Sequence, residues 1–101
     1  MSLRVILITG ANGGLGQAIA RAFLQESPTN FVWLGVRARR EHADQLVQET
    51  PDRCRGVVLD VASPESWKQA VDEILARHSR IDVLVNNAGC HEDCLLATMP
   101  P

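Results

Sequence analysis

The sequence contains no tyrosine and a single lysine, Lys68, among its 101 residues. A site that needs a tyrosine hydroxyl, or a tyrosine beside a lysine ammonium group, therefore cannot be assembled from these residues. Aromatic residues are scarce overall, at 4%. The three cysteines are an odd number, and their spacing gives no disulfide framework. A reducing, cytoplasmic location is therefore the default expectation.

Long apolar runs and strong charge of one sign are also missing. The longest apolar run falls far short of the roughly 20 residues that span a membrane, and the first residues lack the layout of a signal peptide. The formal net charge of −2 predicts no surface for nucleic acid or for an anionic membrane. With 46% hydrophobic and 22% charged residues, the composition suits one small α/β domain or part of a larger one.

The most informative segment is a glycine-rich turn between an apolar run and a helical pattern. The run at 3–9 predicts a buried parallel strand, and apolar residues at helical spacing predict a helix over 14–26. The turn is made of Thr9, Gly10, Ala11, Asn12, Gly13, Gly14, Leu15 and Gly16. Glycines let the backbone approach a ligand closely, and the N–H groups that begin the next helix favour an anion. The segment therefore predicts a phosphate-binding turn.

Strands and helices are expected to alternate along the rest of the chain. Apolar runs predict strands at 31–36, 55–59 and 81–85. Helical spacing predicts helices at 41–49 and from Pro64, with Ser63 as N-cap. The buried face of the last helix is expected to carry Trp67, Val71, Ile74, Leu75 and His78, with His78 as a cap near the helix end. Only this helix is expected to cover its face of the sheet.

This order predicts an α/β fold, namely the N-terminal part of a Rossmann-type doubly wound parallel sheet with strand order 3-2-1-4. Right-handed crossovers and the glycine turn after the first strand lead to that order. The dinucleotide-binding domain is expected to occupy residues 1–101. Ligands of such sheets bind beyond the carboxyl ends of the strands, where the direction of strand addition reverses.

Three motifs lie at predicted carboxyl ends. The turn does not fit G-x-G-x-x-G, because Ile19 stands where a third glycine or alanine would fall. It fits T-G-x-x-x-G-x-G, carried by Thr9, Gly10, Gly14 and Gly16. The other two motifs are Asp60-Val61 and Asn86-Asn87-Ala88-Gly89. In this order and in these places, the three motifs resemble the short-chain dehydrogenase/reductase family over the whole chain.

The resemblance implies a nicotinamide dinucleotide as cofactor and a role for each motif. The glycine turn would hold the pyrophosphate, and Asp60 and Val61 would contact the adenine ring. The ribose region would be lined by Asn87, Ala88 and Gly89. Considered without the family, Asp60 is equally well explained as a carboxylate that caps the following turn.

Arg37 indicates which dinucleotide is preferred. Folds that bind NAD usually carry Asp or Glu at the end of the second strand, where it bonds the ribose 2′-hydroxyl. Here Gly35-Val36 fills that place, and Arg37 follows with Arg39 and Arg40 close behind. Positive charge just before a helix is disfavoured by the helix dipole, and a bound 2′-phosphate would explain it. NADP is therefore predicted over NAD, and a solvated basic cluster is the alternative.

The end of the sequence carries two further patterns. The run Cys90-His91-Glu92-Asp93-Cys94 contains metal-ligand residue types, but no second cluster completes a structural zinc site, so no metal is predicted. From Asn86 onward the sequence resembles the N-N-A-G-x-x-x-D-x-L-L-x-x-M run of bacterial 3-oxoacyl-acyl-carrier-protein reductases. That resemblance implies reduction of a carbonyl to an alcohol, with a 3-oxoacyl thioester as candidate substrate.

The family's chemistry depends on a serine and a Tyr-x-x-x-Lys pair, and the chain has no tyrosine. No catalytic residue is therefore assigned. The chain is expected to be the cofactor-binding half of a homo-oligomeric reductase, truncated before its catalytic segment and marginally stable alone. A non-catalytic dinucleotide-binding module or remnant is the alternative.

Overall fold

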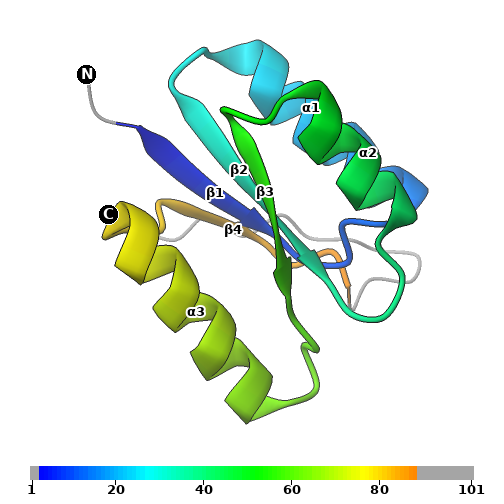
Figure 1. The fold of residues 1–101 in the computed structure, drawn as a ribbon, viewed down its shortest axis with the longest axis vertical. Coiled ribbons are helices and arrows are strands. Elements are labelled where there is room, and N and C mark those ends of the chain that lie inside the picture. The colour runs from blue at the N-terminus through cyan, green and yellow to red at the C-terminus, as the bar shows by residue number, and fades with distance from the viewer. Residues whose placement is uncertain (1–2, 89–101) are drawn as a thin grey trace.

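The computed structural model describes residues 3–88, and within them strands and helices alternate throughout. The elements are β1 (Arg4–Ile8), α1 (Gly14–Glu26), β2 (Asn30–Val36), α2 (Glu41–Glu49), β3 (Cys54–Val58), α3 (Pro64–His78) and β4 (Val83–Val85) (Figure 1). The predicted helix ranges 14–26 and 41–49 are confirmed. The predicted N-cap of α3 is confirmed too, since Ser63 Oγ accepts a hydrogen bond from the Ser66 N–H.

The strands form one parallel sheet in the order β3-β2-β1-β4, which confirms the predicted topology. β1 lies in the middle and pairs with β2 on one side and with β4 on the other. Because all strands run in the same direction, their carboxyl ends meet at one edge of the sheet. The direction in which strands are added reverses between β1 and β4, and this is the position where such sheets bind ligands.

The helices cover the two faces of the sheet unequally (Figure 1). α1 and α2 pack over one face, on a core that includes Ile6, Ile8, Ala20, Leu24, Val32, Leu34, Ala43 and Leu46. α3 packs over the other face, on a core formed by Val5, Leu7, Phe31, Trp33, Val57, Leu59, Ala70 and Ile74. Successive residues of β1 and β2 alternate between the two cores, as the pleat of a strand requires.

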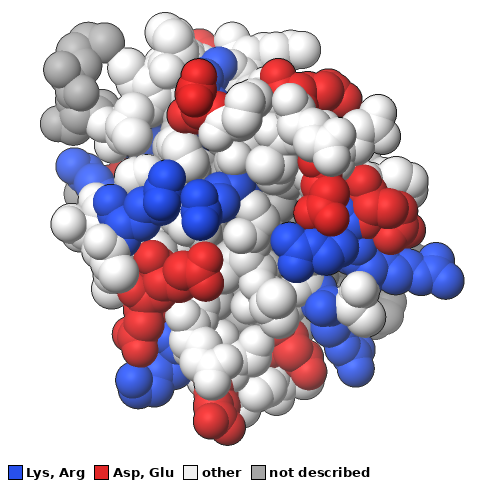
Figure 2. Space-filling model, viewed as in Figure 1, with Lys and Arg blue, Asp and Glu red and all other residues white. Residues whose placement is uncertain are grey.

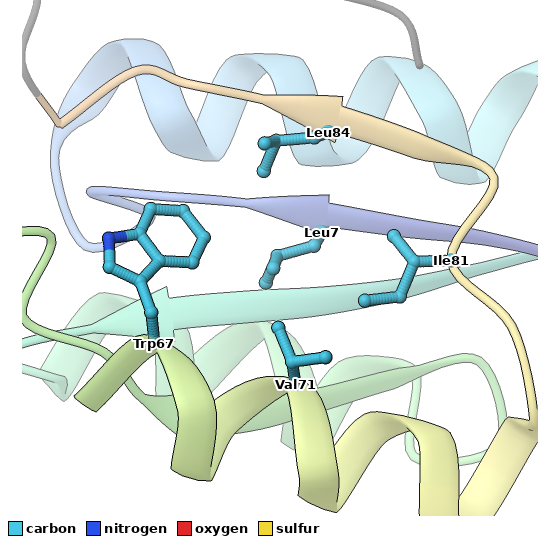
Figure 3. Close-up of a pocket in the computed structure, with 5 residues that line it drawn as sticks. All are labelled: Leu7, Trp67, Val71, Ile81 and Leu84. Carbon is cyan, nitrogen blue, oxygen red and sulfur yellow. The ribbon is translucent and has the colours of Figure 1, made fainter. Parts of the chain in front are cut away.

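An apolar groove opens beside β4 on the face that α3 covers (Figure 3). Its volume is about 310 Å³, and its lining residues are Leu7, Trp67, Val71, Ile81 and Leu84. Among the described residues, β4 has no neighbouring strand on its outer side. Parallel sheets ordinarily have both faces covered, so this corner leaves apolar surface open.

The strand ends differ from the sequence prediction by one or two residues. β1 is one residue shorter at each end, β2 starts one residue earlier, and β3 is displaced by one residue toward the N-terminus. β4 is shorter than 81–85, because Asp82 bonds β1 with its side chain. Its Oδ2 accepts a hydrogen bond from the Val5 N–H at 2.7 Å, in place of a backbone carbonyl.

Two predictions for α3 are wrong. Leu75 does not lie on the buried face but is 41% exposed. His78 does not cap the helix, because Ser79, with φ of 65°, takes the left-handed conformation that ends it. His78 Nδ1 instead accepts a hydrogen bond of 3.0 Å from Nε1 of the buried Trp33. His78 is therefore part of the core packing beneath α3.

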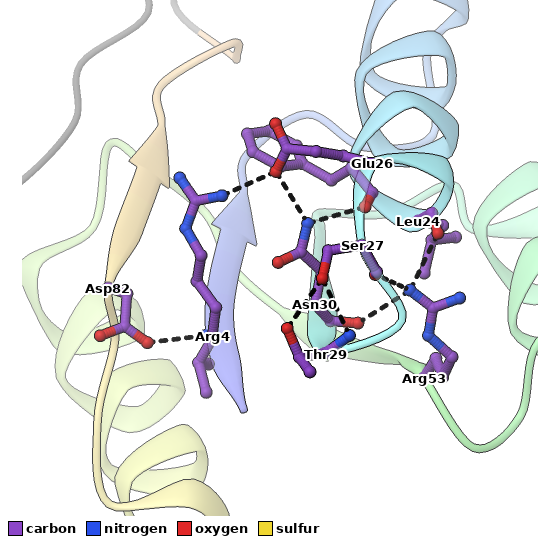
Figure 4. Close-up of polar contacts among 10 residues, drawn as sticks. Arg4, Leu24, Glu26, Ser27, Thr29, Asn30, Arg53 and Asp82 are labelled. Carbon is purple, nitrogen blue, oxygen red and sulfur yellow. Dashed lines mark hydrogen bonds and ion pairs between the residues drawn. The ribbon is translucent and has the colours of Figure 1, made fainter. Parts of the chain in front are cut away.

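Arg53 forms hydrogen bonds across the amino ends of the strands near α1 (Figure 4). Its Nη2 donates to the carbonyl oxygens of Leu24, Ser27 and Asn30. The last carbonyl groups of an α-helix have no partner within the helix, and Arg53 supplies one from just before β3. This end of the sheet is therefore held by a side chain from another element.

The charged surface is mixed. On the face drawn in Figure 2, lysine and arginine lie interspersed with aspartate and glutamate. Within residues 3–88, no helix has the length and apolar character to cross a membrane.

Candidate functional site

The carboxyl ends of the strands bring the predicted motifs to one edge of the sheet. The glycine turn follows β1, Arg37 follows β2, Asp60 lies two residues beyond β3, and Asn86 follows β4. Gly89 and the run from Cys90 to Cys94 lie outside the described residues. Among the described residues, no group of three or more His, Cys, Asp or Glu could hold a metal ion.

Thr9 ties the end of β4 to the glycine turn. Its Oγ accepts hydrogen bonds from the N–H groups of Asn87 and Ala88, each at 2.9 Å. Its own N–H donates to the Val85 carbonyl oxygen at 3.0 Å. The residue is fully buried, so its hydroxyl holds the two strand ends together and does not face solvent.

Gly10 and Gly16 allow the turn to close tightly. Gly10 has φ of +60°, and a Cβ placed on it would lie 2.9 Å from the Cα of Ala88. A Cβ on Gly16 would lie 2.6 Å from the Gly10 carbonyl oxygen and 2.8 Å from the Cα of Ala11. Both approaches are too short for any side chain, and Asn87 Nδ2 also donates to the Gly10 carbonyl oxygen at 3.1 Å. These two glycines are required by the protein's own packing.

Gly13 and Gly14 are different, because the protein leaves room beside them. A Cβ on Gly14 would meet no atom within 4 Å, and one on Gly13 would lie 3.7 Å from its nearest contact. Both residues are exposed, as is Leu15 at 52%. Packing within the described residues therefore does not explain why positions 13 and 14 are glycine, whereas close approach of a ligand would.

The amino end of α1 lacks the partners that the other two helices have. Ser63 caps α3, and Glu65 places negative charge in its first turn. The first turn of α2 contains Glu41 and Asp44. In contrast, no described side chain caps α1, and its first turn has no acidic residue. Its first N–H groups therefore remain as donors for an anion at the open glycines.

Ala11 and Asn12 connect the turn to its surroundings. The buried Ala11 donates its N–H to the Gly35 carbonyl oxygen at 3.0 Å and accepts from Gln17 Nε2 at 2.8 Å. Asn12 bonds the first turn of α2 with its side chain. Sequence reasoning missed Gln17 and Gly35. A glycine inside a strand was the available signal for Gly35, since it marks close backbone approach.

Arg37 and Asp60 approach each other across the ends of β2 and β3. Arg37 Nε lies 3.8 Å from Asp60 Oδ2, and the two side chains are 79% and 36% exposed. Asp60 Oδ1 also accepts from the Ala62 N–H at 3.0 Å, as a carboxylate that caps a turn does. Because the ion pair is long and exposed, it contributes little stability, and both side chains remain accessible.

Val61 and Asp60 are both held by the first turn of α3. Trp67 Nε1 donates to the Val61 carbonyl oxygen at 2.9 Å, and the Asp60 N–H donates to Ser66 Oγ at 2.8 Å. The sequence did not single out Ser66. Val61 is partly buried against the core beneath α3.

Two groups with shifted pKa values lie at opposite ends of the sheet, Glu41 at the start of α2 near the site and Cys54 at the amino end of β3. The pKa of Glu41 is lowered, first by a hydrogen bond from its own backbone N–H and to a smaller extent by Asn12, His42 and Arg39. Burial raises the pKa of Cys54 to about 11. This free cysteine is therefore a neutral core residue at physiological pH.

The sequence pattern that defines short chain dehydrogenases matches residues 4–100. The chain belongs to the short-chain dehydrogenase family. One relative is the 3-oxoacyl-acyl-carrier-protein reductase of Thermotoga maritima, which is 38% identical over 99 residues, or 95% of this chain and 39% of that protein. The chain thus spans about two fifths of that relative.

Two similar solved structures contain a nicotinamide dinucleotide. L-sorbose reductase from Gluconobacter frateurii, complexed with NADPH and L-sorbose, matches with 33% identity and a TM-score of 0.74, over 92% of this chain and 36% of its own. 3-Ketoacyl-(acyl-carrier-protein) reductase from Brucella melitensis, complexed with NADH, matches with 31% identity and a TM-score of 0.76, over 87% of this chain and 35% of its own. Both of these relatives are reductases in complex with a nicotinamide dinucleotide, NADPH in one and NADH in the other.

Proposed function

We propose that residues 1–101 form the dinucleotide-binding part of an NADP-dependent reductase that converts a carbonyl group to an alcohol. The pyrophosphate lies against the turn from Gly10 to Gly16, and Arg37 bonds the 2′-phosphate. Asp60 and Val61 contact the adenine ring, and residues 87–89 line the ribose. Bound in this way, the cofactor supplies a hydride for the carbonyl carbon.

The observation that carries this proposal is the amino end of α1. It has no side-chain cap, no acidic residue in its first turn, and two glycines with open space beside them. Thr9 and Ala11 are buried and hold the turn from behind. A rigid turn with unpartnered N–H donors suits a pyrophosphate group, since the donors need no reorganisation when the anion arrives.

The preference for NADP rests on Arg37. No carboxylate stands at the end of β2, where NAD-binding folds usually have one. Arg37 is accessible, and among residues 3–88 it pairs with Asp60 alone, through the long contact. Because the similar structures include both an NADPH and an NADH complex, the family alone leaves this choice open. A charge-assisted bond to a phosphate contributes about 1.5–3 kcal/mol, which is roughly a tenfold to hundredfold preference.

A 3-oxoacyl thioester is the proposed substrate class, and a homo-oligomer the proposed state of the parent. Support for the substrate comes from the similarity to the Thermotoga maritima reductase and from the D-x-L-L-x-x-M run at Asp93. The proposal places the proton-transfer residues of the reaction outside these 101 residues, which contain no tyrosine.

The direct test is a calorimetric titration of the chain with NADPH and, separately, with NADH. We expect NADPH to bind at least tenfold more tightly. The variant Arg37→Ala should abolish that preference while the affinity for NADH changes less than twofold. An NADPH/NADH affinity ratio that is unchanged in folded Arg37→Ala would show that Arg37 does not select the cofactor.

A second candidate is a non-catalytic dinucleotide-binding module, which the absence of tyrosine favours. The coding sequence beyond the codon for Pro101 separates the two. An in-frame Tyr-x-x-x-Lys some tens of residues further on would support the reductase, whereas a stop codon would support the binding module. The titration with NADPH and NADH tests cofactor binding for both candidate functions.

A further inference from the structure

We propose that Asn12 is a positioning residue for recognition of the 2′-phosphate. It fixes the first turn of α2, and thereby the arginine segment (residues 37–40), against the glycine turn. The inference rests on the proposed NADP-binding function and adds a residue that selects the cofactor without being assigned contact with its 2′-phosphate.

Three hydrogen bonds join Asn12 to α2. Asn12 Oδ1 accepts from the N–H groups of His42, at 2.8 Å, and Ala43, at 3.1 Å. The Asn12 backbone carbonyl oxygen lies 3.0 Å from His42 Nδ1, which must carry the proton in order to donate. Asn12 thus caps a helix that begins nearly thirty residues further along the chain.

The residue just before α2 in the sequence does not cap this helix with its side chain. Arg40 occupies the N-cap position and makes no side-chain cap bond. Its guanidinium pairs with Asp44 on the same helix, so it does not connect α2 to the glycine turn. The first N–H groups of an α-helix need partners, and Asn12 Oδ1 supplies two of those bonds.

The arginine segment has little else to hold it. It forms neither strand nor helix, and all of its residues are exposed. At its start, Arg37 is 79% exposed and lies 3.8 Å from Asp60, a contact too weak to fix a side chain. Its two ends are therefore placed by β2 on one side and by α2 on the other, and Asn12 joins the first turn of α2 to the glycine turn.

This link matters because one ligand would span both places. The pyrophosphate would lie on the glycine turn and the 2′-phosphate on Arg37, at a separation set by the ligand's covalent structure. An error of about 1 Å in such an arrangement weakens recognition substantially. Asn12 Oδ1 accepts two bonds from α2, so its removal would displace the first turn of α2 and with it Arg37, and the proposed effect on the 2′-phosphate is exerted through that displacement.

The experiment compares four ligands on the chain, namely NADP, NAD, adenosine 2′,5′-bisphosphate and AMP. Losing a helix cap costs about 1 kcal/mol, so Asn12→Ala should lower the NADP/NAD affinity ratio about fivefold. The ratio for adenosine 2′,5′-bisphosphate over AMP should fall by the same factor. Because Asn12 lies in the turn proposed to hold the pyrophosphate, NAD and AMP serve as references, and their affinities should fall less than those of NADP and adenosine 2′,5′-bisphosphate. The control Gln69→Ala removes an exposed amide from α3 and should leave both ratios unchanged.

Asn12→Asp provides the rescue. Its carboxylate can accept the same two N–H bonds, so at high salt, where the added charge is screened, both ratios should remain near those of the unaltered chain in the same buffer. At low salt the added negative charge repels the extra phosphate of NADP and of adenosine 2′,5′-bisphosphate, so both ratios should be lower there. Amide hydrogen exchange gives a ligand-free measure, since the N–H groups of His42 and Ala43 should exchange faster in Asn12→Ala and not in Asn12→Asp.

The outcomes separate this inference from the proposed function. If the unaltered chain prefers NADP and Asn12→Ala lowers NADP and NAD affinity by the same factor, the inference is wrong and the function stands. If the unaltered chain binds neither dinucleotide, both are wrong. Should Asn12→Ala fail to fold, the NADP/NAD affinity ratio is measured on Asn12→Ser, whose shorter hydroxyl reaches α2 poorly. An unchanged ratio in that variant would overturn the inference.

Discussion

The two ends of the parallel sheet differ in one set of backbone polar groups. Side chains complete backbone hydrogen bonds at both ends, but they leave the first N–H groups of α1 open. At the amino ends, side chains complete the hydrogen bonds that the strands and helices leave open, as Arg53 does for three carbonyl oxygens (Figure 4). Asp82 does so for the N–H of Val5, and Asn30 Nδ2 for the carbonyl oxygen of Phe23. At the carboxyl ends, the first N–H groups of α1 have no side-chain cap.

This difference separates structural polar groups from those available to a ligand. A buried polar group without a partner costs roughly 1–3 kcal/mol. At the amino ends these backbone groups have side-chain partners, although Asn30 Oδ1 and Arg53 Nε are themselves buried without one. The buried side of the glycine turn is also fixed by the protein, through the hydrogen bond to Thr9 and the close packing at Gly16. Its outer side is left open, which is what a site for an exchangeable anion requires.

The largest expected effect is a loss of stability when a side chain is added at Gly16, where the glycine turn has no room for one. Gly16→Ala places a Cβ within 2.8 Å of backbone atoms on two sides, and we expect it to lower the free energy of unfolding by about 3 kcal/mol. Gly14→Ala is the matched control, since its Cβ meets nothing within 4 Å. Thermal melts of both variants measure the difference, and equal stabilities would contradict the distinction between packed and open glycines.

A somewhat smaller effect is expected at the amino ends. Arg53→Met keeps the length of the side chain but leaves three carbonyl oxygens without their donor, so the free energy of unfolding should fall by about 2 kcal/mol. Affinity for NADPH should not change. Lys68→Met, on an exposed lysine paired only along its own helix, should shift stability by less than about 0.5 kcal/mol. A loss of NADPH affinity in folded Arg53→Met would show that the amino ends of the sheet influence ligand binding at the carboxyl ends.

The smallest expected effect is a pH dependence at His78. Its pKa lies below the ordinary value, first because of burial and then because of Arg77 and Arg55. The unfolded chain therefore takes up the proton more readily, and stability should be full above about pH 6.5 and decrease as the pH falls toward the lower folded pKa. His78→Gln keeps an acceptor for Trp33 Nε1 but does not titrate. In this variant, the free energy of unfolding measured with denaturant should depend less on pH. An unchanged pH dependence would show that another group causes it.

The sequence predicted well whatever depends on neighbours in the chain. The ranges of α1 and α2, the Ser63 cap and the strand order all follow from local spacing, capping residues and the handedness of crossovers. The family assignment followed from three motifs at carboxyl ends, and the comparisons confirm it.

Contacts between distant residues could not be predicted in this way. His78 bonds Trp33 across 45 positions, and Asp82 shortens β4 by bonding Val5 across 77. The bond from Asn12 to α2 likewise joins residues thirty positions apart. A local pattern shows that such a side chain can donate or accept, but only the fold brings its partner to it. The roles assigned to the site residues remain predictions that ligand binding will test.

The most direct test of the central claim is to measure stability and NADPH affinity together on Gly14→Ala. Among the described residues, a methyl group at this position meets no neighbouring element within 4 Å, and it favours the helix. The free energy of unfolding should therefore stay the same or rise by up to about 1 kcal/mol. The same methyl group would stand where the pyrophosphate approaches, so NADPH affinity should fall at least tenfold. A variant that is as stable as the unaltered chain and binds NADPH equally well would contradict the claim that the open end of α1 holds the cofactor.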